Sequence, residues 1–373
     1  MPKILFVATV PEHFRYFHLP CFQMLEDMGY TVDTVCGEAE SFPHTAHRFS
    51  VPMGRNPLDP RNLNAYFRLR KILRDGQYDA VHCHTPVGGA LTRLAARPLR
   101  RKGLRVLYTA HGFHFYRGAS VSGWLLFYPI EWLLSFYTDA LITINREDYD
   151  RAVRRLHARQ TAYVHGVGCN TSRFYRAEGA ERDAKRAAFG ASPEDQILVY
   201  VAEQNENKNQ GMLLEAAQAL FETGRFPHLR LWIIGPDHIG GAYADRARSL
   251  SVPVRFFGER HDIPDILSVC DVYTASSLRE GLPVNVMEAM AAELPVIAKN
   301  NRGHRALVRN GETGYLVDSV SEMTDRIERL LTDDALAARM RTAAKERVQK
   351  YDLQNVLAEL RAIYDTTETE GRA

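Results

Sequence analysis

The sequence is poor in cysteine, contains no long apolar run and has almost no excess of charge of either sign. Its five cysteines, at positions 21, 36, 83, 169 and 270, form no Cys-x-x-Cys pair, which favours reduced thiols in a cytosolic protein over disulfides or a zinc site. The most apolar stretch, residues 123–137, is interrupted by Pro129 and Glu131. No segment therefore reaches the roughly 18 apolar residues of a membrane span. The N-terminal PKILFVATV has no small-residue cleavage site, so it predicts a strand and not a signal peptide.

The composition is that of a globular protein with two unlike halves. Hydrophobic residues make up 45% of the 373 residues and charged residues 25%, and this length suits two domains. Residues 1–176 contain 23 Lys and Arg against 14 Asp and Glu, whereas the remainder contains 24 against 31. A basic half predicts contact with an anionic surface. Because no nucleic-acid-binding motif accompanies the basic residues, an anionic membrane leaflet is favoured over nucleic acid.

Short apolar runs alternate with helical patterns through both halves, as in βαβ units with parallel sheets. We therefore predict an α/β fold with two doubly wound, Rossmann-like domains. The polar stretch 173–195 is predicted to be the junction between the two domains and to contain a short helix. The predicted strands are 3–10, 31–36, 80–84, 105–111, 140–145, 196–203, 229–235, 254–258, 272–276 and 295–299.

The most informative segment, SSLREGLPVNVMEAMAAELPVI from Ser276 to Ile297, carries Glu280 and Glu288 with seven residues between them. Gly281 and Pro283 predict a turn leading into an apolar helix, with Glu280 on the loop and Glu288 about a turn and a half into the helix. The backbone N–H groups of residues 281–285 would then lie at the positive end of that helix, where phosphate binds. Carboxylates that accept from hydroxyl groups, beside amides that hold phosphate, predict a site for a nucleotide sugar.

This segment resembles the Glu-x7-Glu element of retaining glycosyltransferases of family 4, which have the GT-B architecture. The resemblance extends over roughly residues 3–365 and is closest to bacterial enzymes of capsule and exopolysaccharide assembly. It implies two Rossmann-like domains with the ligand cleft between them. By this resemblance we expect an acceptor-side domain at 1–176, a donor-binding domain at 190–351, a helix at 352–366 that crosses back to the first domain, and a disordered tail at 367–373.

The resemblance also implies roles for residues of the second half. Lys208 corresponds to a family lysine that holds the diphosphate, but Ala202-Glu203 stands where the family has Gly-Arg, which removes a bidentate clamp. Glu288 would accept the ribose hydroxyls, and Glu280 would bind the sugar and stabilise positive charge at its anomeric carbon. The other implied donor-binding residues are Gly258, Arg260, Gly281, Leu282, Pro283, Val284 and Asn285.

The first half is expected to supply the acceptor side. His111, in VLYTAHGFHF, is similar to the histidine of the family's Thr-x-His-Gly element, which lies beside the donor sugar, and it is predicted to be catalytic together with Glu280. Residues 113–120 are expected to form an exposed loop, while 124–137 are equally compatible with an exposed or a buried helix. The other acceptor-side candidates are His18, His84, Gly88, Gly89 and Phe113.

Two patterns resemble metal-ligand sets, and neither predicts a metal site. His82 and His84 share one face of a strand, but two ligands without a third nearby are weak evidence. Asp148-Tyr149-Asp150 spells an Asp-x-Asp, yet acidic residues here suit the first turn of a helix. We therefore expect no metal or cofactor to be required, with the nucleotide sugar acting as a co-substrate.

Together these observations predict transfer of a sugar from a nucleoside diphosphate sugar, with UDP favoured, to a hydroxyl acceptor such as a polyprenyl-diphosphate-linked glycan. The expected place is the cytoplasmic face of a membrane, with peripheral contact to anionic lipid. Two alternatives stay open. One is a GT-B UDP-sugar epimerase, an isomerase that needs no acceptor. The other is an inactive nucleotide-sugar-binding protein, which the missing Gly-Arg favours.

Overall fold

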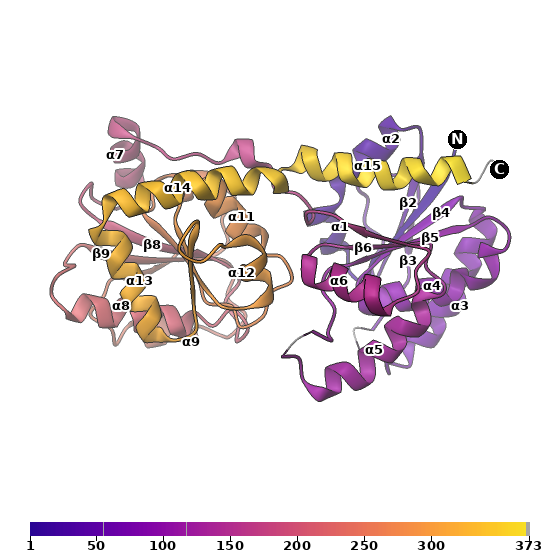
Figure 1. Ribbon diagram of the computed structural model, residues 1–373, viewed down its shortest axis with the longest axis horizontal. Coiled ribbons are helices and arrows are strands. Elements are labelled where there is room, and N and C mark those ends of the chain that lie inside the picture. The colour runs from indigo at the N-terminus through magenta and orange to yellow at the C-terminus, as the bar shows by residue number, and fades with distance from the viewer. Residues whose placement is uncertain (55, 117, 371–373) are drawn as a thin grey trace. The chain divides into compact units, whose positions relative to one another are not determined.

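The computed structural model describes residues 1–54, 56–116 and 118–370, and the chain divides into two compact units (Figure 1). Unit 1 comprises Met1–Gly168 and Gln354–Ala373, and unit 2 comprises Cys169–Leu353. Within the described ranges, no helix combines the length and apolar character needed to cross a membrane. All five cysteines are buried and free.

Unit 1 is built on a seven-stranded parallel sheet with the order β3-β2-β1-β4-β5-β6-β7. Ile4 of β1 lies opposite Val32 of β2 on one side and Ala80 of β4 on the other, so the strand order reverses between β1 and β4. Its elements are β1 (Lys3–Val7), α1 (Pro11–Phe17), α2 (Leu19–Asp27), β2 (Thr31–Cys36), β3 (Arg48–Ser50), α3 (Arg61–Gly76), β4 (Ala80–His84), α4 (Pro86–Arg100), β5 (Arg105–Ala110), α5 (Val121–Ser135), β6 (Ala140–Thr143), α6 (Arg146–Arg155), β7 (Gln160–Tyr163) and α15 (Leu353–Glu370).

Two apolar clusters bury the faces of this sheet, which explains why its central strands are apolar along their whole length. A buried ion pair attaches α5 to the first of these clusters. Arg93 of α4 donates to both carboxylate oxygens of Glu131 at 2.9 and 3.1 Å, and the hydroxyl of Tyr108 donates to the same carboxylate at 3.1 Å. Glu131, which interrupts the apolar run of the sequence, thus lies on the packed side of α5.

The second cluster of unit 1 is completed by α15, the last helix of the chain. Val356, Ile363 and Tyr364 of α15 are buried in it, and Figure 1 shows α15 lying alongside α2 in this unit. The Tyr364 hydroxyl is 2.5 Å from Nδ1 of His82, and Nε2 of His82 is 2.8 Å from the Thr109 hydroxyl. Both ring nitrogens of His82 are therefore occupied, in agreement with the non-metal interpretation of this residue.

Unit 2 is built on a six-stranded parallel sheet with the order β10-β9-β8-β11-β12-β13. The strand order reverses between β8 and β11, because β8 pairs with β9 on one side and β11 on the other. Its elements are η1 (Thr171–Arg173), α7 (Gly179–Ala188), β8 (Gln196–Val201), α8 (Gln210–Glu222), β9 (Leu229–Ile234), α9 (Ala242–Ala247), β10 (Val254–Phe256), α10 (Ile263–Ser268), β11 (Val272–Ala275), α11 (Val284–Ala291), β12 (Val296–Lys299), α12 (Arg302–Leu307), β13 (Gly314–Val317), α13 (Val320–Thr332), α14 (Asp334–Val348) and η2 (Gln349–Tyr351).

The structure shifts two of the expected boundaries. Residues 169–176 belong to unit 2 and not to unit 1, because Cys169 and Phe174 are part of the unit 2 core and the N–H of Cys169 donates to the Tyr351 carbonyl. Residues 367–370, expected to be disordered, continue α15, whereas 371–373 lie outside the described residues.

The strands that the sequence did not predict, β3, β7 and β13, are all at sheet edges. An edge strand pairs on one side, so it needs a weaker apolar pattern than a central strand. The short helix predicted within the junction is present as α7.

Tyr364→Phe tests how far unit 1 depends on α15. Losing the hydroxyl leaves Nδ1 of His82 buried without this partner, which costs roughly 1–3 kcal/mol. We expect the urea midpoint of unit 1 to fall. Tyr16→Phe, at an exposed tyrosine of the same unit, is the control and should leave the midpoint unchanged. Equal midpoints for the two variants would contradict the importance of this contact.

Candidate active site

The donor candidates Lys208 and Glu280 lie on the two loops that flank the reversal of strand order in unit 2. Lys208 follows β8 and Glu280 follows β11, and the lysine Nζ donates to Oε1 of Glu280 at 2.7 Å. The side chains are 17% and 14% exposed, so the ion pair is partly shielded from water. In doubly wound sheets, ligands bind at the carboxyl ends of strands where the order reverses. The structure therefore brings together two residues that are 72 positions apart in the sequence.

Hydrogen bonds fix these two loops against each other. The backbone N–H of Leu278 donates to the Asn207 carbonyl at 2.8 Å, and the Asn207 side chain donates to the Arg279 carbonyl at 3.0 Å. The Ser276 hydroxyl donates to the Lys208 carbonyl at 2.7 Å. Because the backbones on both sides are held, the ion pair lies at a position set by the fold and not by two flexible side chains.

Gly303 of α12 supports Glu280, a role that no local pattern of residues predicts. A Cβ at position 303 would lie 2.7 Å from Cβ of Glu280 and 2.9 Å from its carbonyl carbon. These distances are shorter than real contacts, so any side chain at position 303 would displace Glu280. The next residue, His304, is buried with Nδ1 2.6 Å from the Lys299 carbonyl, and burial lowers the pKa of its imidazole.

The N-terminus of α11 lies beside this ion pair, in the sequence that directly follows Glu280. Pro283 precedes the first helical residue with extended angles, φ −76° and ψ 117°, and as the N-cap residue it offers no side-chain cap. In the first turn the Val286 N–H donates to Oδ1 of Asn285 at 2.9 Å. Gly281, Leu282 and Pro283 thus belong to the loop, and only Val284 and Asn285 of the expected phosphate-binding residues lie within the helix. The Asn285 side chain donates to the Val201 carbonyl at 2.6 Å, which ties α11 to the end of β8.

Glu288 lies one turn into α11 and is partly buried. Burial raises the pKa of its carboxyl from the ordinary 4.5 to about 7, and the nearby Arg173 opposes this shift only partly. A carboxyl with this pKa is poised to give up its proton when hydroxyl donors approach it. This behaviour fits the role predicted for Glu288.

The remaining donor candidates, Gly258 and Arg260, lie on the loop after β10. Gly258 has a left-handed φ of +67°, and its carbonyl accepts from the Gly235 N–H at 2.7 Å. Arg260 is bound to Asp262 through two contacts of 2.8 and 2.5 Å. Glu203, which stands in place of the family arginine, has Oε2 3.4 Å from Nε2 of His238, with both side chains about half exposed.

In unit 1, the loops that follow β1, β4 and β5 place His111 within a group of histidines. His111 Nε2 is 3.1 Å from Nε2 of His13 and 3.3 Å from Nδ1 of His84, and the rings of His18 and His84 are 4.2 Å apart. The structure therefore unites the predicted residues His18, His84 and His111. It adds His13, which the sequence analysis missed because no spacing rule connects the first helix to two distant strands.

Two further acceptor-side candidates, Gly88 and Gly89, are explained by close packing. A Cβ on Gly88 would lie 2.8 Å from the Thr85 hydroxyl, and one on Gly89 would lie 2.5 Å from the Tyr108 ring. The hydroxyls of Thr9 and Thr85 are 2.7 Å apart, which joins the loop after β1 to the start of α4. A small first turn of α4 is what permits this contact.

The expectation of an exposed loop at 113–120 is wrong for its first part. Phe113 and Phe115 are buried and stack at 4.7 Å, and the Phe113 N–H donates to Asp148 at 3.0 Å. Asp148 is fully buried in the first turn of α6, where its own N–H is capped by Asn145. The carboxylate thus has the structural role predicted for it, and it is what draws Phe113 into the core.

Comparison with known proteins agrees with this architecture. The family model "Glycosyltransferase Family 4" matches residues 22–173, and "Glycosyl transferases group 1" matches residues 181–347. The putative glycosyltransferase EpsD of Bacillus subtilis (strain 168) is 45% identical over 369 residues, covering 97% of this chain and 96% of EpsD. An Escherichia coli enzyme, UDP-Gal:alpha-D-GlcNAc-diphosphoundecaprenol alpha-1,3-galactosyltransferase, is 25% identical and covers 92% of this chain and 91% of its own.

Solved structures show the same fold at low sequence identity. Anabaena Alr3699/HepE, in complex with UDP and glucose, superposes with a TM-score of 0.75 at 16% identity, covering 98% of this chain and all of HepE. WaaG, a glycosyltransferase of lipopolysaccharide biosynthesis, superposes with a TM-score of 0.73 at 17% identity, covering 97% and 99%. From the family models, the EpsD identity and this shared architecture, we conclude that the chain belongs to glycosyltransferase family 4 and is a glycosyltransferase of the GT-B fold.

Proposed function

We propose that this glycosyltransferase moves a sugar, with retention of configuration, from a UDP-sugar to a hydroxyl group of a glycan carried on a polyprenyl diphosphate. The observation that carries the proposal is the 2.7 Å contact between Lys208 and Glu280, beside the uncapped N-terminus of α11. Two comparisons support its chemistry. HepE has been solved with UDP-glucose, and the Escherichia coli relative is named for transfer to a diphosphoundecaprenol-linked sugar.

In this proposal, the donor diphosphate binds at the first turn of α11 and shares the charge of Lys208. The uncapped N–H groups and the lysine are complementary to a doubly charged diphosphate. Once phosphate takes part of the lysine's charge, an oxygen of Glu280 becomes available to the hydroxyls of the sugar. Glu288 accepts from the ribose, and binding favours its ionised form.

The transfer step uses the same groups. The acceptor oxygen forms a bond to the anomeric carbon on the face from which UDP departs, and the bonding electrons leave with the diphosphate. Lys208 and the α11 amides stabilise that negative charge, while Glu280 stabilises the positive charge at the anomeric carbon. The acceptor proton ends on the departing diphosphate.

A second candidate function is nucleotide-sugar binding without transfer, because Glu203 and His238 occupy the place of the family arginine. The epimerase alternative is not supported by the comparisons, which match transferases. The two remaining candidate functions, sugar transfer and nucleotide-sugar binding, differ in one measurable property. A transferase releases UDP in the presence of acceptor, and a binding protein does not.

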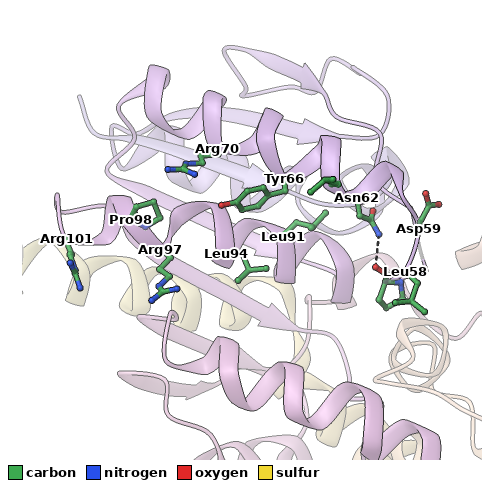
Figure 2. A pocket seen from close by; sticks show the side chains of 12 residues that line it. Leu58, Asp59, Asn62, Tyr66, Arg70, Leu91, Leu94, Arg97, Pro98 and Arg101 are labelled. Atoms are coloured by element: carbon green, nitrogen blue, oxygen red, sulfur yellow. Dashed lines mark hydrogen bonds between the residues drawn. The ribbon is translucent and has the colours of Figure 1, made fainter.

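We further propose that unit 1 docks on an anionic membrane through the surface formed by α3, α4 and α5. α4 packs against both other helices. Leu125 and Leu133 of α5 are 74% and 48% exposed, although their helix has a buried side of its own. A groove of about 820 Å³ lies between α3 and α4, and Figure 2 shows Arg70, Arg97 and Arg101 toward one end of it. Exposed leucines on α5 and guanidinium groups on α3 and α4 suit the boundary between acyl chains and anionic headgroups.

Lys208→Met and Glu280→Gln separate binding from transfer. Lys208→Met removes a charge-assisted contact to the diphosphate, so the UDP dissociation constant should rise about 10- to 100-fold. Glu280→Gln should bind UDP within a few-fold of wild type and lose most transfer activity. Calorimetry with UDP and an assay of acceptor-dependent UDP release measure the two effects.

Lys345→Met provides the matched control, because Lys345 forms a surface ion pair with Glu293 at the same 2.7 Å. Lys345→Met should change neither the UDP dissociation constant nor the acceptor-dependent release of UDP. If Lys208→Met and Glu280→Gln also leave both properties at wild-type values, the proposed donor site is wrong. UDP binding without acceptor-dependent release in the wild-type protein would favour the non-catalytic function.

Glu288 predicts a pH dependence of donor binding. Below its pKa of about 7 the carboxyl is protonated and must lose that proton to accept from the ribose hydroxyls, so affinity should rise from pH 6 and level off above pH 8. UDP-glucose is the suitable probe because its diphosphate carries no group that titrates in this range. In Glu288→Gln the profile should be flat and the affinity lower.

The same shift has a consequence for the free protein. In the unfolded chain the pKa of Glu288 is near 4.5, whereas in the folded protein it is about 7. Between these two pH values the unfolded state has lost the proton and the folded state keeps it. The free energy of unfolding therefore falls as the pH rises from 4.5 to about 7 and then stays constant. Glu288→Gln should therefore be more stable than wild type at pH 8, by up to about 3 kcal/mol before any allowance for water screening, and not at pH 4. Equal stability at both pH values would contradict the raised pKa.

Sedimentation with vesicles tests the membrane surface. Leu125→Asp together with Leu133→Asp should abolish binding to vesicles that contain phosphatidylglycerol, and high salt should weaken wild-type binding because the arginines contribute. Val153→Asp is the control, since Val153 is 55% exposed on α6, outside the proposed surface. Wild-type protein that fails to sediment at low salt would refute the proposal.

A further inference from the structure

Four histidines of unit 1 converge where its strand order reverses. His13 belongs to α1, His18 joins α1 to α2, His84 ends β4, and His111 follows β5. Each offers a ring nitrogen such that all four atoms lie within 4.8 Å of one another. Three separate segments of the chain therefore deliver imidazoles to one point, and hydrogen bonds and packing around β1 and β4 hold those segments in place.

Two of the distances between the nitrogens match those between neighbouring ligands of a metal ion. Nε2 of His111 lies 3.1 Å from Nε2 of His13 and 3.3 Å from Nδ1 of His84. Tetrahedral zinc with Zn–N bonds of 2.0–2.1 Å places neighbouring nitrogens about 3.3 Å apart. One nitrogen of His111 thus stands at ligand spacing from two others.

Two nitrogens of the group lack partners. Nε2 of His18 and Nε2 of His84 are buried and accept or donate no hydrogen bond within the part of the chain that the structure describes. For His84 this atom is not Nδ1, the nitrogen that lies at ligand spacing from His111. His18 and His84 are 6% and 0% exposed. A buried imidazole nitrogen without a partner costs about 1–3 kcal/mol, and native proteins seldom leave one unused. The neighbouring His82 makes the contrast plain, because the Tyr364 and Thr109 hydroxyls occupy both of its nitrogens.

The chemistry of the side chains indicates the kind of ion. Burial lowers the pKa of His13 to about 4 and holds the pKa values of His18, His84 and His111 well below their ordinary range. A neutral imidazole presents one lone pair, which is what a metal ion binds. Magnesium and calcium prefer oxygen ligands, whereas zinc-type ions bind neutral imidazole.

From the convergence of four imidazoles, the ligand spacing around His111 and the unpaired nitrogen of His18, we propose that His13, His18, His84 and His111 bind a divalent transition-metal ion of the zinc type. The ion would tie the loops after β1, β4 and β5 together at the acceptor side of unit 1. It would also orient His111, one of whose nitrogens would remain for other contacts. This site is independent of the donor residues, all of which belong to unit 2.

Metal titration of the full chain tests the site directly. Protein freed of metal with a chelator and then titrated with Zn²⁺ against a chromogenic competitor should bind one ion per chain, with a dissociation constant below about 1 µM. Co²⁺ in place of Zn²⁺ should give the intense visible absorption of a tetrahedral site. Mg²⁺ should not compete.

Three variants locate the ligands. His13→Gln, at the partly exposed rim of the group, and His84→Ala and His111→Ala, at its centre, should each weaken Zn²⁺ binding by more than about tenfold. His47→Ala removes an exposed imidazole of the same unit and should leave binding unchanged. UDP binding by unit 2 and circular dichroism report whether each variant is folded.

The outcomes are distinct from those of the donor-site experiments. Absence of Zn²⁺ binding at micromolar concentration overturns the proposal, as does binding that folded His13→Gln retains at wild-type affinity. Equal competition by Mg²⁺ also overturns it. Loss of transfer activity in Lys208→Met or Glu280→Gln leaves the titration unaffected, so failure of the proposed function and failure of the metal site can be told apart.

Discussion

Both units depend on one constraint of parallel sheets. Where the strand order reverses, the chains that leave neighbouring strands turn away in opposite directions, and no helix covers the gap between their carboxyl ends. Unit 1 has this reversal between β1 and β4, and unit 2 has it between β8 and β11. His111 and the neighbouring histidines lie at the reversal in unit 1. Lys208 and Glu280 lie at the reversal in unit 2.

The polar side chains at the two reversals of strand order are paired in different ways. In unit 2 the lysine and the carboxylate neutralise each other, and a phosphate that displaces part of this contact finds compensating amides close by. In unit 1 the imidazoles are neutral and leave buried nitrogens unpaired. Side chains two residues apart on one strand show how local the difference is, since His82 is fully occupied and His84 is not.

Much of this architecture could be predicted from the sequence. Central strands were found because both of their faces are buried, and Glu280 and Glu288 were placed correctly because a Gly-Leu-Pro turn has few alternatives. Gly303 and His13 could not be found in this way. Their roles arise from contacts between segments far apart in the chain, and no local pattern encodes a missing Cβ that supports another residue's backbone. Phe113 was misplaced for the same reason, because the buried Asp148 that draws it inward lies 35 residues later.

The return of the chain to unit 1 has a consequence for synthesis on the ribosome. Val356, Ile363 and Tyr364 supply part of the unit 1 core, yet they are translated after the whole of unit 2. Unit 2, whose residues are contiguous, emerges complete before them. Domains generally fold as units in the order of their emergence. In this protein the earlier part of unit 1 must wait with an apolar face uncovered until α15 emerges, so unit 2 is the first that can finish folding.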